Sequence, residues 1–388
     1  MLRIVSAYSP PRPSRRLARK AACVLALFAA ACGSSHTPTS TVTTARPPTP
    51  GGPSNATPAK LATDAAYAFL DGYTTDGGRI QRTDQGGDTV GEGQAYGMLA
   101  AAAVGDQQRF NSIWSWTKKN MQDSDGLLAF HWVGGRVVDP HPAADADLDA
   151  ARALLLAACR FHRPDLRRAG VRIGDSVLAR ETARAGSIEV LLAGPWANMG
   201  SHLVFNPSYV DPTTLDALAA ATGDVRFRAV VAGSTQLVNE LTRPLPPDWS
   251  IVNAATGQVT PVSAASSAAR PGMFTYDAPR TLVRFAVDPT PVGRAAVARA
   301  WGVFKYTQPR DIVTEHELSG TAVGTSHDAV TLVAAAGAAK AADDTAALLP
   351  LLAEAQQLNA QHPTYYGSAW VALGRLMLTT SLLQPCSR

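Results

Sequence analysis

Glu92 is the side chain in this sequence whose surroundings best suit proton transfer. It lies between Gly91 and Gly93, just ahead of an apolar run over residues 98–104. The run predicts a buried helix, because apolar residues would surround the helix axis on nearly all sides. Burial beside this helix, with Tyr96 screening the carboxyl group, would raise the pKa of Glu92 and let it act as a general acid. The alternative is that Glu92 only complements the helix dipole at an exposed N-terminus.

A second group of acids precedes another predicted buried helix. Asp145, Asp147 and Asp149 occupy every second position before an apolar run that ends at Phe161. Either Asp145 or Asp147 is expected to cap this helix, since aspartate is a preferred N-cap residue. Three acids are more than capping requires, so one of them is available to hold a hydroxyl group of a ligand.

Asp277 is the third candidate, and two arginines follow it. Arg280 and Arg284 lie one helical turn apart in an expected helix over 278–287. Their positive charge would keep Asp277 ionised. One protonated and one ionised carboxyl group form the pair that cleavage of a glycosidic bond requires.

Aromatic side chains on the connecting segments extend this interpretation to sugars. An aromatic face offers a large apolar surface on which the apolar face of a sugar ring can pack. Each of these rings could instead be part of the core. The candidates are Trp132, Tyr209, Trp249 and Tyr276.

The elements that must position these residues are nearly all helical. Apolar helices alternate with more polar ones, and no alternating strand pattern is long enough to build a sheet. About twelve helices in two rings would form an all-α (α/α)6 barrel, whereas a helical solenoid would show a fixed sequence period, which is missing. The expected helices cover 60–70, 92–104, 106–121, 147–161, 171–185, 213–221, 226–242, 278–287, 292–304, 328–342, 344–359 and 364–380.

The first 32 residues predict export. A basic stretch over 15–20 precedes an apolar run over 21–31 and small residues before Cys32, as in a signal peptide. Cys32 either follows plain cleavage or carries a lipid that tethers the protein to a membrane. Residues 33–59, rich in Ser, Thr, Pro and Gly, predict a disordered linker, so we expect the catalytic domain over 60–388. The expected location is outside a bacterial cell, released or anchored on its outer face.

Charge and cysteine content argue against several kinds of partner. The chain has a formal charge of +4, but without residues 1–31 it has 29 basic and 31 acidic residues. This balance gives no reason to expect nucleic-acid binding. Without a Cys-x-x-Cys pair or zinc-like histidine spacing, we expect no metal and no cofactor, and we expect a monomer. Cys159 is expected either to pack as a small apolar residue or to form a disulfide with Cys386.

The motifs together resemble glycoside hydrolase family 8, which includes bacterial endoglucanases. Residues 91–98 are similar to the family stretch (Ser/Gly)-Glu-Gly-Gln-x-Tyr-Gly-Met. Further motifs follow in the family's order, and the resemblance covers roughly residues 60–382. They lie at 125–128, 144–149, 206–209, 247–249, 276–280 and 365–366.

The resemblance implies an (α/α)6 barrel that hydrolyses β-1,4-glucan with inversion of the anomeric centre. Matched motif by motif, Glu92 would be the general acid and Asp277 the general base, roughly 6.5–9.5 Å apart. Asp145 would hold the sugar at the cleavage point, and Tyr209 would orient the water or that sugar. The other expected substrate-binding residues are Trp132, Trp249, Arg280, Arg284, Tyr276 and Tyr96.

Two departures from the family pattern leave the substrate open. Ala144 stands where Ser or Thr is usual, and Val283 lies in a stretch that usually contains a tryptophan. We consider three functions: an exported endo-β-1,4-glucanase; the same fold acting on chitosan, xylan or mixed-linkage β-glucan; and a glucan-binding surface lipoprotein with weak catalysis. The presence of both Glu92 and Asp277 favours an enzyme, because binding alone requires neither.

Overall fold

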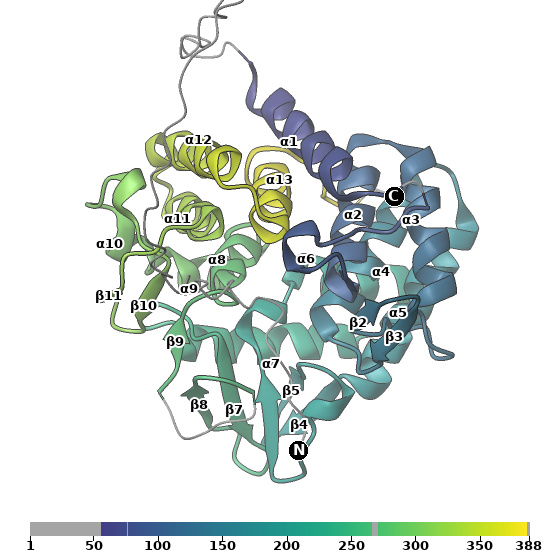
Figure 1. The fold of residues 1–388 in the computed structure, drawn as a ribbon. Helices are drawn as coiled ribbons and strands as arrows, with labels where there is room; N and C mark the ends of the chain where they lie inside the picture. Colours follow the sequence, from purple (N-terminus) through teal and green to yellow (C-terminus); the bar gives the residue numbers. More distant parts are fainter. Residues whose placement is uncertain (1–55, 76, 266–270, 386–388) are drawn as a thin grey trace, which may run out of the picture. The chain divides into compact units, whose positions relative to one another are not determined.

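The computed structural model describes residues 56–75, 77–265 and 271–385, and six of its helices form a closed inner ring. Successive inner helices contact one another, and the last one contacts the first. In chain order the inner helices are α2 (Gly91–Val104), α4 (Ala144–Arg160), α6 (Pro212–Thr222), α8 (Pro279–Ala286), α11 (Ala329–Ala341) and α13 (Tyr365–Thr379) (Figure 1).

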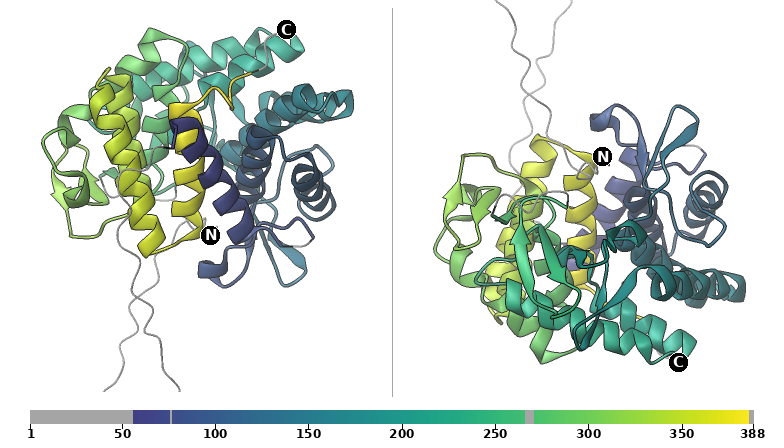
Figure 2. Two further views of the ribbon diagram at one scale, coloured as in Figure 1. Left: turned by 90° about the horizontal axis from the view of Figure 1, so that it is seen from above. Right: turned by 90° about the horizontal axis from the view of Figure 1, so that it is seen from below.

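A second ring of helices covers the first on the outside. Its members are α1 (Pro58–Tyr73), α3 (Gln107–Asn120), α5 (Pro164–Arg180), α7 (Arg226–Leu241), α9 (Pro291–Ala298) and α12 (Thr345–Gln361), and the short α10 (Trp301–Phe304) follows α9. Seen from above, α1 lies beside α13, so the two ends of the helical series meet (Figure 2). The arrangement confirms the expected (α/α)6 barrel.

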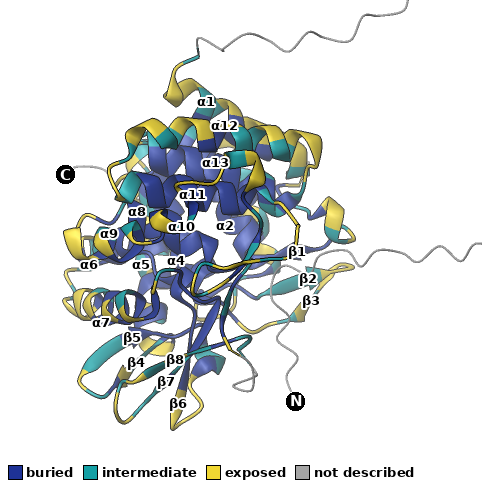
Figure 3. Cartoon of the chain, turned by 90° about the vertical axis from the view of Figure 1, so that its left-hand side faces the viewer, coloured by how far each residue is buried: buried dark blue, intermediate teal, exposed yellow. Residues whose placement is uncertain are grey.

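The amino-acid content of the helices decides which ring they join. Nearly every residue of α2 and α11 is buried, whereas α1 and α12 keep exposed outer faces (Figure 3). Small residues let inner helices approach closely. At Gly337 of α11, an added Cβ would lie 2.7 Å from the carbonyl oxygen of Leu282 on α8, so this contact requires glycine. Val283, at the departure from the family pattern, is buried beside the same glycine.

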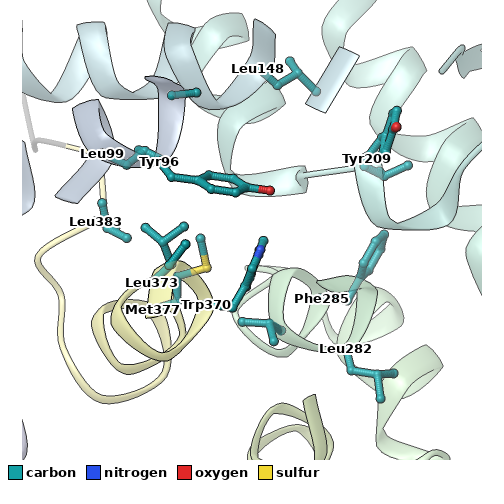
Figure 4. Packing of buried hydrophobic residues seen from close by; sticks show 14 of the residues in the cluster. Tyr96, Leu99, Leu148, Tyr209, Leu282, Phe285, Trp370, Leu373, Met377 and Leu383 are labelled. Atoms are coloured by element: carbon teal, nitrogen blue, oxygen red, sulfur yellow. The ribbon is translucent and has the colours of Figure 1, made fainter. Parts of the chain in front are cut away.

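Aromatic residues fill the space that the inner helices enclose. Tyr96 of α2 packs edge-on against Trp370 of α13, with ring centroids 5.7 Å apart. Figure 4 shows both rings pointing into the same space, with Tyr209 and Phe285 across from them. All four side chains are buried, and burial of such rings contributes most of the packing energy of a core.

Four buried charged residues form a second set of contacts among the inner helices. Arg284 of α8 binds Asp149 of α4 through two hydrogen bonds of 2.8 and 2.7 Å. It also donates to Asp211 at 3.0 Å, and Arg152 donates to the same carboxylate at 2.8 Å. Burial alone would raise the pKa of Asp211, but the two arginines lower it below its usual value. The network therefore keeps four charges paired where water cannot reach them.

Short strands occupy the connections between helices, so the expectation that the chain has no sheet is wrong. The strands have two to five residues each and form antiparallel sheets. Such short segments show no alternation that a sequence pattern could detect. One sheet contains β1 (Thr89–Val90), β2 (His131–Val133) and β3 (Arg136–Asp139), and a second contains β4 (Thr182–Ala185) and β5 (Ile188–Leu191). A third contains β6 (His202–Phe205), β7 (Trp249–Asn253) and β8 (Val259–Val262). A fourth contains β9 (Met273–Phe274), β10 (Glu315–Glu317) and β11 (Ala322–Val323).

Several helix boundaries differ from those expected. The expected helix at 171–185 begins at Pro164 and ends at Arg180, and its last residues form β4 instead. The expected helix at 292–304 is interrupted between α9 and α10. Asp106 does cap α3, accepting a hydrogen bond of 2.9 Å from the Arg109 amide.

The predicted cap of α4 is wrong. The N-cap residue is Ala143, and α4 begins at Ala144, three residues before the expected start. Asp145 and Asp147 therefore lie inside the first turn, and neither carboxylate serves as the cap. Asp145 instead accepts a hydrogen bond of 2.9 Å from the adjacent Ala146 amide, and Asp147 accepts one of 2.7 Å from the Leu128 amide.

Parts of the predicted domain organisation lie outside the described residues. These include the predicted signal peptide, Cys32 and most of the predicted linker; α1 begins at Pro58, within the last residues assigned to that linker. Cys159 is disulfide-bonded, and its predicted partner Cys386 is not among the described residues. None of the described helices combines the length and apolarity needed to span a membrane.

Replacing Arg284 with methionine tests the buried charge network. The variant leaves Asp149 and part of Asp211 without a partner charge, so we expect the free energy of unfolding to fall by about 3–5 kcal/mol. Chemical denaturation of the two proteins measures the difference.

Arg180→Met is the matched control. Arg180 also forms ion pairs, with Asp123 and Asp125, but its side chain is 38% exposed. We expect its loss to change stability by less than about 1 kcal/mol. Equal effects of the two substitutions would contradict the importance of the buried network.

Candidate active site

Glu92 lies in the first turn of α2 with only 3% of its surface exposed. Burial raises the pKa of its carboxyl group to about 8; the negative charge of Asp145 adds to the effect, and Arg280 opposes it. The interpretation of Glu92 as an exposed helix-dipole residue is therefore wrong. At neutral pH this carboxyl group holds a proton that it can donate.

The residues around Glu92 explain why the motif has its particular composition. Gln94 accepts a hydrogen bond of 2.6 Å from the Ile80 amide and donates one of 2.7 Å to Thr117. The Gly91 amide donates to the carbonyl oxygen of Phe130 at 3.0 Å. These bonds join the start of α2 to two neighbouring segments and fix the position of Glu92.

Arg280 connects the other two candidate carboxylates. It donates to Asp145 at 2.5 Å and to Asp277 at 2.8 Å, although these acids lie 132 positions apart in the sequence. The guanidinium group also donates to Tyr96 Oη at 3.3 Å and lies over the ring of Tyr209, 5.2 Å from its centroid. Arg280 is 1% exposed. One buried cation thus brings Asp145, Asp277, Tyr96 and Tyr209 together.

Asp248 holds the backbone that carries Asp277. Its Oδ1 accepts hydrogen bonds from the amides of Thr275, Asp277 and Ala278, at 3.1, 3.0 and 2.7 Å. The sequence showed Asp248 only as part of the motif at 247–249, with no indication of this function. A single aspartate before a tryptophan carries no local signal, because its partners are 27 to 30 positions away.

The arginines do not act on Asp277 as expected. Burial raises the pKa of Asp277 to about 7 even though Arg280 lowers it, and the charges of Asp248 and Asp145 raise it further. Arg284 binds Asp149 and Asp211 instead of Asp277. The prediction that both arginines keep Asp277 ionised is therefore wrong for Arg284, and Arg280 offsets only part of the effect of burial.

Tyr209 and Trp249 lie together beside this cluster. Trp249 is the first residue of β7, is 5% exposed, and packs edge-on against Tyr209 at 5.8 Å. Trp196 is half-buried and was not among the candidates from the sequence. Its ring centroid lies 6.5 Å from that of Trp249. The series Tyr209, Trp249 and Trp196 therefore leads from Arg280 toward the surface.

The other two predicted aromatic residues, Trp132 and Tyr276, have different neighbours. Trp132 of β2 is half-buried, with the Arg79 guanidinium 5.0 Å from its ring centroid and Trp116 packed edge-on at 5.2 Å. Tyr276 is also half-buried, and its carbonyl oxygen accepts a hydrogen bond of 2.9 Å from Tyr366. Their roles in sugar binding stay predictions.

A second buried pair of carboxyl groups adjoins the site. Asp147 accepts a hydrogen bond of 2.7 Å from the Leu128 amide, and its Oδ2 is buried without a hydrogen-bond partner among the described residues. Glu181, which directly follows α5, is fully buried like Asp147, and the two carboxyl groups lie close enough to shift each other's pKa. Burial raises the pKa of each, and the negative charge of Asp145 raises both further. Both carboxyl groups are therefore protonated more readily than ordinary side-chain acids.

Among the described residues, no group of three or more His, Cys, Asp or Glu side chains could hold a metal ion. The site residues are thus a protonated Glu92 and two aspartates joined by one arginine. Such a site can donate a proton from one group and accept one at another.

A sequence model of glycosyl hydrolases family 8 matches residues 56–380. The chain belongs to this family. It is 36% identical, over 222 residues, to a probable endoglucanase of Novacetimonas hansenii, covering 55% of this chain and 63% of that protein. Endoglucanase A of Acetivibrio thermocellus is 27% identical over 327 residues, and the match covers 80% of this chain and 66% of that protein. The chain spans less than two thirds of the length of the first curated relatives it matches.

Solved structures of family 8 enzymes share this architecture. The endo-β-1,4-glucanase CMCax from Acetobacter xylinum superposes with a TM-score of 0.71 at 30% sequence identity. The match covers 82% of this chain and 99% of that one. The expected resemblance to family 8 is therefore confirmed.

We expect a bell-shaped pH dependence of kcat/KM on a soluble β-glucan. If Asp277 acts as the base in its ionised form, activity rises as the pH rises through about 7, and if Glu92 acts as the acid in its protonated form, activity falls above about 8. Initial rates from pH 4 to 10 measure the profile. An optimum below about 5 would show that both groups titrate near their ordinary values and would contradict the effect of burial.

Glu181→Gln tests the second carboxyl pair. In the wild type the folded state holds protons that the unfolded chain loses above about pH 4, so stability falls as the pH rises through the raised pKa values. An amide at residue 181 donates to Asp147 at every pH, so we expect a flatter decline of Tm between pH 5 and 9.

Glu189→Gln is the control for this substitution. Glu189 lies on β5, is partly exposed, and contacts Arg184 at 3.6 Å. Its removal should leave the pH dependence of Tm unchanged. Parallel curves for the wild type and Glu181→Gln would show that the pair holds no shared proton.

Proposed function

We propose that this protein is an exported endo-β-1,4-glucanase that cleaves with inversion of the anomeric centre. The observation that carries the proposal is Arg280, which binds Asp145 and Asp277 together beside the buried and protonated Glu92. The names of the relatives, which are endoglucanases, support β-glucan as the substrate class.

In the proposed reaction, Glu92 donates its proton to the glycosidic oxygen while the bond between that oxygen and the anomeric carbon breaks. Asp277 takes a proton from a water molecule, whose oxygen forms the new bond on the opposite face of the sugar. Asp145 binds hydroxyl groups of the sugar at the cleavage point, and Arg280 fixes the separation between Asp145 and Asp277. No group beyond these side chains and water is required.

Arg280 also affects how readily Asp277 accepts a proton. Asp277 starts with a raised pKa, which makes it a stronger base than an ordinary aspartate once it is ionised. Its bond to Arg280 keeps a fraction ionised near neutral pH. We propose that these opposed effects adjust Asp277 to accept a proton near pH 7.

The proposed location of the protein is outside the cytosol. Cys159 is disulfide-bonded, and stable disulfides are typical of compartments outside the cytosol. Together with the predicted signal peptide, this supports a role at or beyond the cell surface, released or tethered through Cys32.

The experiment measures reducing ends released from carboxymethylcellulose, barley β-glucan, xylan and chitosan by the wild type and two variants. We expect activity on the glucans and a loss of roughly 10²–10⁴-fold in Glu92→Gln and in Asp277→Asn, because each loses one proton-transfer group. Glu189→Gln, a partly exposed substitution on β5, should retain full activity.

Two results would overturn the proposal. Full activity of Glu92→Gln would remove the general acid from its role. A folded wild type that binds glucan but releases no reducing ends from any polymer would instead support a glucan-binding surface protein.

A further inference from the structure

Tyr365, the first residue of α13, has a buried hydroxyl group without a use in the reaction described so far. The side chain is 4% exposed, and in the described part of the chain its Oη has no hydrogen-bond partner. A buried polar group without a partner is costly, so such groups often mark a functional site.

The ring of Tyr365 is held in place by its neighbours rather than by its hydroxyl group. It packs against Phe69 and Tyr73 of α1, with ring centroids 6.2 and 5.9 Å away. The Thr364 side chain caps α13 by accepting a hydrogen bond of 3.0 Å from the Gly367 amide. Aromatic packing and the helix cap therefore determine where the hydroxyl group points.

The hydroxyl group points at the start of α2, where Glu92 lies. A Cβ added at Gly93 would lie 2.8 Å from Tyr365 Oη, so only glycine at this position lets the phenol approach the helix. Glu92 Oε2 is likewise buried and has no hydrogen-bond partner. Two polar atoms without partners thus adjoin the same helix turn, one on the general acid and one on a rigid donor.

We propose that Tyr365 is a positioning residue for Glu92, donating its Oη–H to Glu92 Oε2 once the carboxyl group has given its proton to the leaving oxygen. The inference rests on the proposed function. Catalytic hydrogen bonds are often long before substrate binds and shorten as the reaction proceeds. The bond would stabilise a carboxylate that forms where water is excluded.

The chemistry of Tyr365 fits this role. Burial raises the pKa of its hydroxyl group well above the usual range, and the nearby Tyr96 and Glu92 raise it further, so it stays a donor at every working pH. The group transfers no proton itself, so the proton balance of the reaction is unchanged.

Tyr365→Phe tests the proposal, with Tyr73→Phe as the matched control. Both substitutions remove one hydroxyl group from the same aromatic cluster, but the Tyr73 hydroxyl group contacts Ser368 at 3.3 Å instead of Glu92. The substrates are cellohexaose and a dinitrophenyl cellobioside, whose leaving group departs without protonation.

For Tyr365→Phe we expect kcat on cellohexaose to fall roughly 10- to 100-fold, with little change on the dinitrophenyl substrate. The alkaline limb of the pH profile should move up by about one pH unit, because the carboxylate loses a charged hydrogen bond. Tyr73→Phe should change neither quantity.

An infrared titration of the Glu92 carboxyl group, assigned by difference from Glu92→Gln, separates this inference from the proposed function. If the wild type cleaves no glucan, the function fails, but the titration midpoint should still rise in Tyr365→Phe. An unchanged midpoint, an equal loss on both substrates, or the same effect in Tyr73→Phe would overturn the assignment of Tyr365.

Discussion

The active site depends on the two salt bridges that Arg280 forms with Asp145 and Asp277. The three side chains come from α4, α8 and the turn before α8, and all are buried. Without the guanidinium group, two carboxylates would face each other and Glu92 in a medium that screens charge poorly. Arg280 lowers the pKa of Asp277 against the effect of burial and holds the two carboxylates at a fixed separation.

The barrel makes this arrangement possible by bringing the starts of α2, α4 and α8 together. Small residues permit the close contact of α8 with α11, and Tyr96 with Trp370 fills the space between α2 and α13. One turn after Arg280, Arg284 joins α8 to Asp149 and Asp211. The same short helix therefore carries one arginine for the site and one for the inner ring.

Local features of the site could be predicted from the sequence, but contacts between distant residues could not. The position of Glu92 at the start of α2 and the cap formed by Asp106 follow from a few adjacent residues. The partners of Arg284 lie 73 and 135 positions away, and nothing near residue 284 indicates them. The residue types identified Glu92, Asp145 and Asp277 as candidates, and the resemblance to family 8 assigned each a role, which no spacing or periodicity indicated. The motifs at 247–249 and 365–366 include Asp248 and Tyr365, but the amides that Asp248 holds and the approach of Tyr365 to Gly93 are visible only in the folded chain.

The most direct test of the account is the anomeric form of the first product. Proton NMR during early hydrolysis of cellohexaose distinguishes the α- and β-anomers of the new reducing end before they interconvert. If a water molecule activated by Asp277 attacks opposite the bond that Glu92 protonates, the α-anomer must appear first. Initial release of the β-anomer would mean that a carboxylate attacks the sugar directly, and the roles assigned to Glu92 and Asp277 would be contradicted.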